Sequence, residues 1–98
     1  MPAYYDREGK RISLLRQCML ASDPGYKLLR TTDTPAGKVI SAWIGEDRAD
    51  PPNAAAPSIF GTIVQHNDGD FDHSVEEFAA TVEECLAYHE LLVASMSL

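Results

Sequence analysis

Three polar side chains of the sequence could act together on a small molecule: Asp47, Arg48 and His89. A carboxylate, a guanidinium and an imidazole can bind a polar ligand or transfer protons if the fold brings them together beside the ring of Trp43. No nucleophile is assigned, because four side chains compete for that role: Ser41, Ser58, Thr62 and Cys85. In the alternative reading, His89 is a core residue whose ring is hydrogen-bonded to the backbone or to a hydroxyl.

The segment 68–73 places aspartates at alternate positions, as a calcium-binding loop does. The EF-hand pattern fails, because position six holds His73 instead of Gly and position twelve holds Ala79 instead of Glu. The segment therefore predicts a turn that carries solvated acids. A transition-metal pair formed by His66 and His73 is the less favoured alternative. We expect neither a metal nor a cofactor.

Positive charge is confined to the first half of the chain. Residues 49–98 hold nine Asp/Glu and no Lys/Arg, whereas residues 1–48 hold eight Lys/Arg and six Asp/Glu. This distribution argues against direct nucleic-acid binding by the acidic half, because phosphates need cations opposite them. It predicts an acidic patch that is the candidate surface for a protein partner: Asp68, Asp70, Asp72, Glu76, Glu77, Glu83 and Glu84.

The sequence leaves three roles open for the acidic half. A net charge of −7 favours solubility. The acids can also dock a basic protein or imitate nucleic acid, or they can bind the mildly basic half of a second copy in a homodimer. If strands from the two halves interleave, the early Lys/Arg neutralise many of these acids. The segment 68–77 and the helix surface with Glu83, Glu84 and Glu90 then remain as the acidic patch.

The chain of 98 residues predicts a single domain, 1–98, with one core. It contains no run of 18 apolar residues, so no membrane span is expected. The polar start MPAYYDREGKR does not look like a secretion signal, which predicts a cytoplasmic protein. Cys18 and Cys85 lie in apolar helical patterns and are predicted to be two buried thiols, with a disulfide between two helices as the alternative.

Hydrophobic periodicity predicts the elements of the first half. A short strand is expected at Tyr4–Asp6, and a helix capped by Ser13 is expected to run to about Ser22. This helix carries one apolar stripe: Leu14, Leu15, Cys18 and Met19. Asp23-Pro24-Gly25 predicts a turn, followed by a hairpin of two strands, Tyr26–Thr34 and Lys38–Glu46. In the second of these strands, one face holds Val39, Ser41, Trp43 and Gly45.

The second half begins with an irregular loop at 47–57 and a strand at Ser58–His66. Two starting points remain open for the last helix, because Ser74 and Thr81 are each followed by a Glu at capping-box spacing. A start at Thr81 leaves Phe71–Ala79 for an edge strand. The predicted fold class is α+β with two layers, in which an antiparallel sheet of four to five strands carries two helices on one face.

Several strings resemble a family of small uncharacterised proteins encoded by phages and bacteria: VISAWIGEDR (39–48), PSIFGTIV (57–64) and TVEECLAYHE (81–90). The family shows an aromatic-Asp-x-x-Gly opening and Ile-Ser-Leu, then Val-Ser-x-x-Trp-x-Gly-x-Asp, Pro-x-Ile-Phe-x-Thr and a Thr-led helix with a His-Glu pair. The matching positions span nearly the whole chain: Tyr5, Asp6, Gly9, Ile12, Ser13, Leu14, Val39, Ser41, Trp43, Gly45, Asp47, Pro57, Ile59, Phe60, Thr62, Thr81, His89 and Glu90.

The resemblance implies a phage or prophage source and favours a helix that starts at Thr81. It supplies no established activity. Relatives often place His after the Asp at 47 and Glu after the Phe at 60, where this chain has Arg48 and Gly61. If the family carries an Asp-His-Glu site, this member has lost most of it.

Three functional hypotheses follow. The first is a small acidic, non-enzymatic interaction protein that binds a host or phage protein. The second is a small-molecule binder or minor enzyme that uses Asp47, Arg48 and His89. The third is a structural homo-oligomer.

Overall fold

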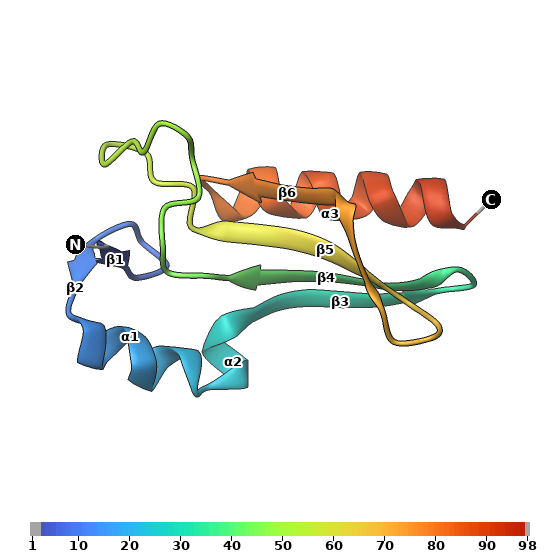
Figure 1. Cartoon of the computed structure of the whole chain (residues 1–98), viewed down its shortest axis with the longest axis horizontal. Helices are drawn as coiled ribbons and strands as arrows, with labels where there is room; N and C mark the ends of the chain where they lie inside the picture. The colour runs from blue at the N-terminus through green and yellow to red at the C-terminus, as the bar shows by residue number, and fades with distance from the viewer. Residues whose placement is uncertain (1–2, 98) are drawn as a thin grey trace.

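The computed structural model, which describes residues 3–97, is built around a four-stranded antiparallel sheet in the order β3-β4-β5-β6 (Figure 1). A separate two-stranded sheet pairs β1 with β2. The elements in chain order are β1 (Tyr4–Tyr5), β2 (Arg11–Ile12), α1 (Leu14–Ala21), α2 (Pro24–Lys27), β3 (Leu28–Thr34), β4 (Gly37–Trp43), β5 (Phe60–His66), β6 (Phe71–Ala79) and α3 (Val82–Met96). The predicted α+β class with a four-stranded antiparallel sheet is confirmed.

The central strands β4 and β5 supply the core, and alternate residues of each point to the same buried face. Val39, Ser41 and Trp43 of β4 are completely inaccessible to solvent, as the alternation predicts. The register sets each of them opposite a buried residue of β5, in the pairs Val39–Val64, Ser41–Thr62 and Trp43–Phe60. The buried face is therefore apolar at both ends and carries hydroxyls in the middle.

Helix α3 covers this buried face, contacting all four strands of the sheet. It begins at the later of the two predicted starts, where the Thr81 hydroxyl accepts a hydrogen bond from the Glu84 amide. The Ser74 start is wrong, because residues 71–79 pair with β5 as the edge strand β6. Cys85, His89 and Leu92 are the buried residues of α3. Among residues 3–97, no helix has both the length and the apolar character needed to cross a membrane.

Helix α1 forms where the sequence predicts it, but its apolar stripe faces solvent. Leu14 and Met19 are each 57% exposed and Leu15 is 72% exposed. Pairing of β1 with β2 holds the start of α1 at the end of the sheet, while α3 occupies the face that α1 was expected to share. The apolar residues of α1 that pack on the core around Trp43 are Leu20 and Ala21, and the Gln17 amide donates to the Ile44 carbonyl at 3.4 Å.

The two cysteines therefore differ in environment. The prediction of two buried thiols is correct for Cys85 and wrong for Cys18, which lies on the exposed stripe of α1. The sulfurs form no disulfide. Tyr26 also departs from the prediction, because Asp23 caps the one-turn helix α2 and the first long strand starts only at Leu28. The Tyr26 ring instead packs edge-on against Trp43, with 5.1 Å between ring centroids.

The charge asymmetry of the sequence persists in the fold. The strand order leaves β3 and β4 on one side and β5 and β6 on the other, so the two halves of the chain do not interleave. Within residues 3–97, Arg30–Glu90 is the single ion pair that joins a Lys or Arg of the first half to an acid of the second. The N-terminal lobe, residues 3–27, holds five Lys/Arg against three Asp/Glu. The interleaving of strands on which neutralisation of the late acids was conditional does not occur.

Candidate functional site

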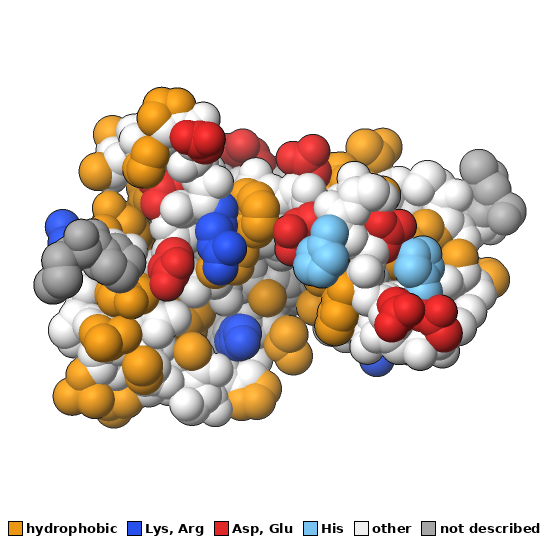
Figure 2. Space-filling view, in the orientation of Figure 1, with side chains coloured by type: hydrophobic (Ala, Val, Ile, Leu, Met, Phe, Trp, Pro, Cys, Tyr) orange, Lys and Arg blue, Asp and Glu red, His pale blue; other side chains and the backbone are white. Residues whose placement is uncertain are grey.

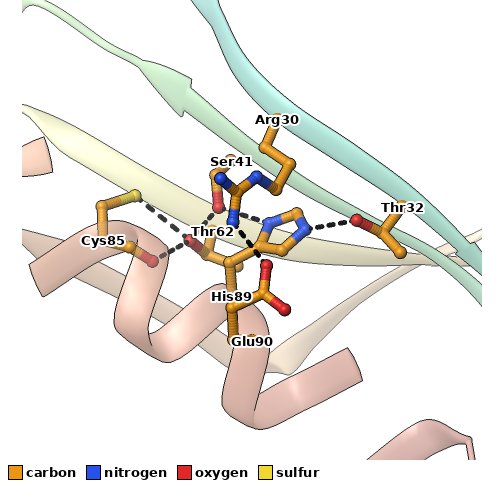
Figure 3. Close-up of polar contacts among 7 residues, drawn as sticks. All are labelled: Arg30, Thr32, Ser41, Thr62, Cys85, His89 and Glu90. Carbon is orange, nitrogen blue, oxygen red and sulfur yellow. Dashed lines mark hydrogen bonds and ion pairs between the residues drawn. The ribbon is translucent and has the colours of Figure 1, made fainter. Parts of the chain in front are cut away.

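The imidazole of His89 lies at the centre of a buried polar network between α3 and the sheet (Figure 3). Its Nδ1 atom is 2.8 Å from Ser41 Oγ on β4, and its Nε2 atom is 2.8 Å from Thr32 Oγ1 on β3. Ser41 Oγ is in turn 2.6 Å from Thr62 Oγ1 on β5, which lies 3.3 Å from Cys85 Sγ on α3. The network thus joins three neighbouring strands to the helix that covers them.

A neutral imidazole has one donor and one acceptor nitrogen, and the network favours the proton on Nδ1. His89 then donates to Ser41, Ser41 donates to Thr62, and Thr62 donates to the Cys85 carbonyl at 3.5 Å. Thr32 donates to Nε2. With the proton on Nε2, the half-buried Thr32 hydroxyl would have to donate to solvent, because no hydrogen bond among residues 3–97 offers it an acceptor. The Nδ1 tautomer satisfies every member of the network.

Burial lowers the pKa of His89, because a charged imidazole has no water around it in this position. Two charged neighbours act in opposite directions: the Glu90 carboxylate raises this pKa and the Arg30 guanidinium lowers it. These two groups form an ion pair beside the network, 2.5 Å between Nη1 and Oε1 (Figure 3). His89 is therefore neutral at pH 7. Its environment agrees with the sequence-based alternative that His89 is a hydrogen-bonded core residue.

Asp47 organises the loop between β4 and β5. Its Oδ1 atom accepts from the amides of Ala49 and Ser58, at 3.0 and 2.8 Å, and its Oδ2 atom accepts from the Asn53 amide at 2.7 Å. Burial raises the pKa of this carboxyl, but the three amide donors outweigh burial and the pKa lies below its ordinary value. Asp47 is thus an ionised loop anchor.

Arg48 and Trp43 also make contacts that stabilise the fold. The Arg48 guanidinium lies over the Phe78 ring, 5.8 Å from its centroid, and the Arg48 amide donates to the Ser58 carbonyl. Trp43 is buried and donates its indole N–H to the Tyr5 carbonyl at 3.0 Å. Within residues 3–97, none of the hydrogen bonds of Asp47 or Arg48 reaches His89. The structure thus gives the four predicted site residues separate partners.

The predicted acidic patch follows one edge of the molecule. Its members lie in the β5–β6 turn, along the edge strand β6, and in the first turn of α3. Figure 2 shows acidic side chains along the upper edge and at the right-hand end, and apolar side chains gathered over α1 at the lower left. Charges on an edge strand discourage pairing with strands of other molecules. The patch therefore has a protective role besides any part in binding.

The two exposed histidines pair with different carboxylates. His66 Nε2 is 3.2 Å from Asp72 Oδ2, and His73 Nδ1 is 3.7 Å from Glu76 Oε1. The hydroxyl and amide of Ser74, followed by His66, lower the pKa of Asp72. In the part of the chain that the structure describes, no three His, Cys, Asp or Glu side chains gather as a metal site requires.

No family model, curated protein or solved structure matches this chain. The resemblance to small phage and bacterial proteins therefore stays a prediction. Sequence reasoning missed the roles of Thr32 and Ser41 as direct partners of His89, and of Thr62 as the partner of Ser41. Their signal was present, because Ser41 and Thr62 are hydroxyls at inward positions of otherwise apolar strands.

Replacement of His89 tests the structural role of the network. His89→Ala removes a buried ring and leaves the Ser41 and Thr32 hydroxyls without their partner, so the free energy of unfolding should fall by about 3 kcal/mol. His89→Gln retains a polar side chain and should cost less. The matched control on the same helix is Leu91→Ala, at a residue 65% exposed, with an expected change within about 0.5 kcal/mol. Urea denaturation measures all three, and equal effects at 89 and 91 would contradict the role.

The lowered pKa of His89 also predicts a pH dependence. In the unfolded chain this group takes up a proton as the pH falls through 6.5, whereas the folded protein resists protonation. Its contribution to stability is therefore complete above pH 6.5 and decreases below it, by at most about 1.4 kcal/mol per pH unit. The stability gap between the wild type and His89→Gln should narrow from pH 7.5 to pH 5, by at most about 2 kcal/mol. A gap that stays constant or widens would show that His89 is not held neutral.

Proposed function

We propose that this chain is a small non-enzymatic interaction module, encoded by a phage or its bacterial host, that binds a partner protein through α1. The observation that carries this proposal is the exposed stripe of Leu14, Leu15 and Met19. Apolar side chains gain free energy when they leave water, by about 25 cal/mol per Å². Large apolar side chains that gather on an exposed helix face mark interaction surfaces more often than scattered ones do.

The charges around the stripe define the chemistry of the partner. Arg16 lies on α1 at the flank of the stripe, and Arg11 lies in β2 just before the helix. Both are exposed, and neither forms an ion pair within residues 3–97. Residues 9–22 contain no Asp or Glu. A complementary partner therefore presents an amphipathic segment with acids beside its apolar residues.

The buried network supports a binding role over a catalytic one. His89 is completely buried, and both of its ring nitrogens are bonded to hydroxyls of the sheet. Asp47 is occupied by three backbone amides of its own loop. The side chains best suited to catalysis, His89 and Asp47, thus stabilise the fold, while α1 is exposed to solvent.

A site-specific crosslink tests this proposal. A photoreactive amino acid replaces Leu15 on the stripe, and a matched control replaces Phe71, which is 50% exposed on β6. After irradiation in cells of the organism that encodes the chain, mass spectrometry maps the crosslinked peptide. We expect a discrete adduct from position 15, attached to an acid-rich amphipathic segment, and a reduction of at least about tenfold when Arg11→Glu and Arg16→Glu are added.

Three outcomes would contradict the proposal. The same adducts could arise from positions 15 and 71. The position-15 adduct could be indifferent to the Arg11→Glu and Arg16→Glu changes. Finally, the label could attach only to lipid, which would indicate that α1 lies on a membrane surface.

A further inference from the structure

The outer face of α3 has the chemistry that α1 requires of a partner. This face, turned away from the sheet, carries three exposed apolar residues, Ala87, Leu91 and Ala94. Glu83, Glu84 and Glu90 surround them on the helix surface and are also exposed. We propose that α1 of one copy docks on the outer face of α3 of a second copy. This inference rests on the proposed function and names the partner surface.

Size complementarity supports this pairing. Ala87 and Ala94 lie seven residues apart, two turns along the same helix face, and leave shallow sites beside Leu91. The stripe of α1 presents larger side chains, Leu14, Leu15 and Met19. Helices pack by fitting the side chains of one into the grooves of the other.

Charge complementarity excludes the pairings of like faces. Two α1 helices placed face to face would bring Arg16 toward Arg16 of the other copy, and two α3 helices would bring Glu83 and Glu84 toward each other. The α1–α3 pairing sets Arg11 and Arg16 against Glu83 and Glu84 instead. Glu90 contributes less, because Arg30 of its own chain already pairs with it.

The two faces cannot satisfy each other within one chain. Helix α1 contacts β1, α2 and the core around Trp43 at the end of the large sheet, whereas α3 covers the four strands of that sheet. Figure 1 shows α1 below the β3 side of the sheet and α3 on the opposite side of that view. A second copy is therefore required to bring the faces together.

The expected association is weak. Helix α1 has eight residues and is about 12 Å long, so its contact with α3 buries a few hundred Å² on each copy. A standard stable interface buries about 800 Å² on each partner. Each copy also carries a net charge of −7, whose repulsion reaches about 8 Å at physiological ionic strength. We therefore expect a dissociation constant on the order of 0.1–1 mM.

Sedimentation equilibrium of the full chain, from about 10 μM to 2 mM in 150 mM salt, tests the inference at concentrations that bracket this range. The average mass should rise with concentration. Two variants reverse or remove charge on one face each: Arg11→Glu with Arg16→Glu on α1, and Glu83→Lys with Glu84→Gln on α3. Gln at 84 preserves the capping box with Thr81. Each variant alone should associate at least about tenfold more weakly, and an equimolar mixture should recover association.

A matched control changes the net charge by the same amount as the α3 variant but at the β5–β6 turn: Asp68→Lys with Asp70→Asn. It should associate at least as well as the wild type, because it lowers the general repulsion and leaves both faces intact. Circular dichroism checks that every variant is folded.

Three results would overturn the inference. A wild type that stays monomeric to 2 mM excludes a second copy as the occupant, and the crosslink from position 15 then decides separately whether α1 binds another protein. Association that survives the α1 variant places the contact elsewhere. A mixture that recovers nothing excludes the pairing of α1 with α3.

Discussion

The hydrogen-bond network around His89 is the interaction on which the rest of the structure depends. It joins β3 through Thr32, β4 through Ser41 and β5 through Thr62 to α3, the longest helix among residues 3–97. A buried hydroxyl or imidazole without a partner costs about 1–3 kcal/mol, so these groups must all meet. A shift of one residue in strand pairing would turn Ser41 or Thr62 to the opposite face of the sheet. The network therefore specifies register as well as the position of α3.

The docking of α3 determines what the rest of the chain can do. Because α3 fills the buried face of the sheet, α1 is left at its end, attached to the core through Leu20 and Ala21. The apolar stripe of α1 consequently meets solvent. The docking of α3 thus leaves an apolar, basic surface on α1 and an acidic surface on β6 and α3.

The sequence predicts which secondary structure a segment forms better than it predicts what that segment packs against. Alternation identified the buried face of β4, and the capping pair Thr81 and Glu84 gave the correct start of α3, since both signals are local. The apolar stripe of α1 correctly predicted a helix but not its exposure, because periodicity cannot tell which of two helices occupies a sheet face. The direct partners of His89 are Ser41 and Thr32, which lie 48 and 57 residues away and come together only through strand register.

The most direct test is the protonation state of the His89 ring, measured by nitrogen NMR of ¹⁵N-histidine-labelled protein at pH 6.5. A free imidazole is half protonated at this pH, the ordinary pKa of the group. We expect His89 instead to give the two distinct nitrogen shifts of a neutral ring, with the proton on Nδ1 in slow exchange with water. A protonated ring or averaged shifts would contradict the network as the basis of the fold.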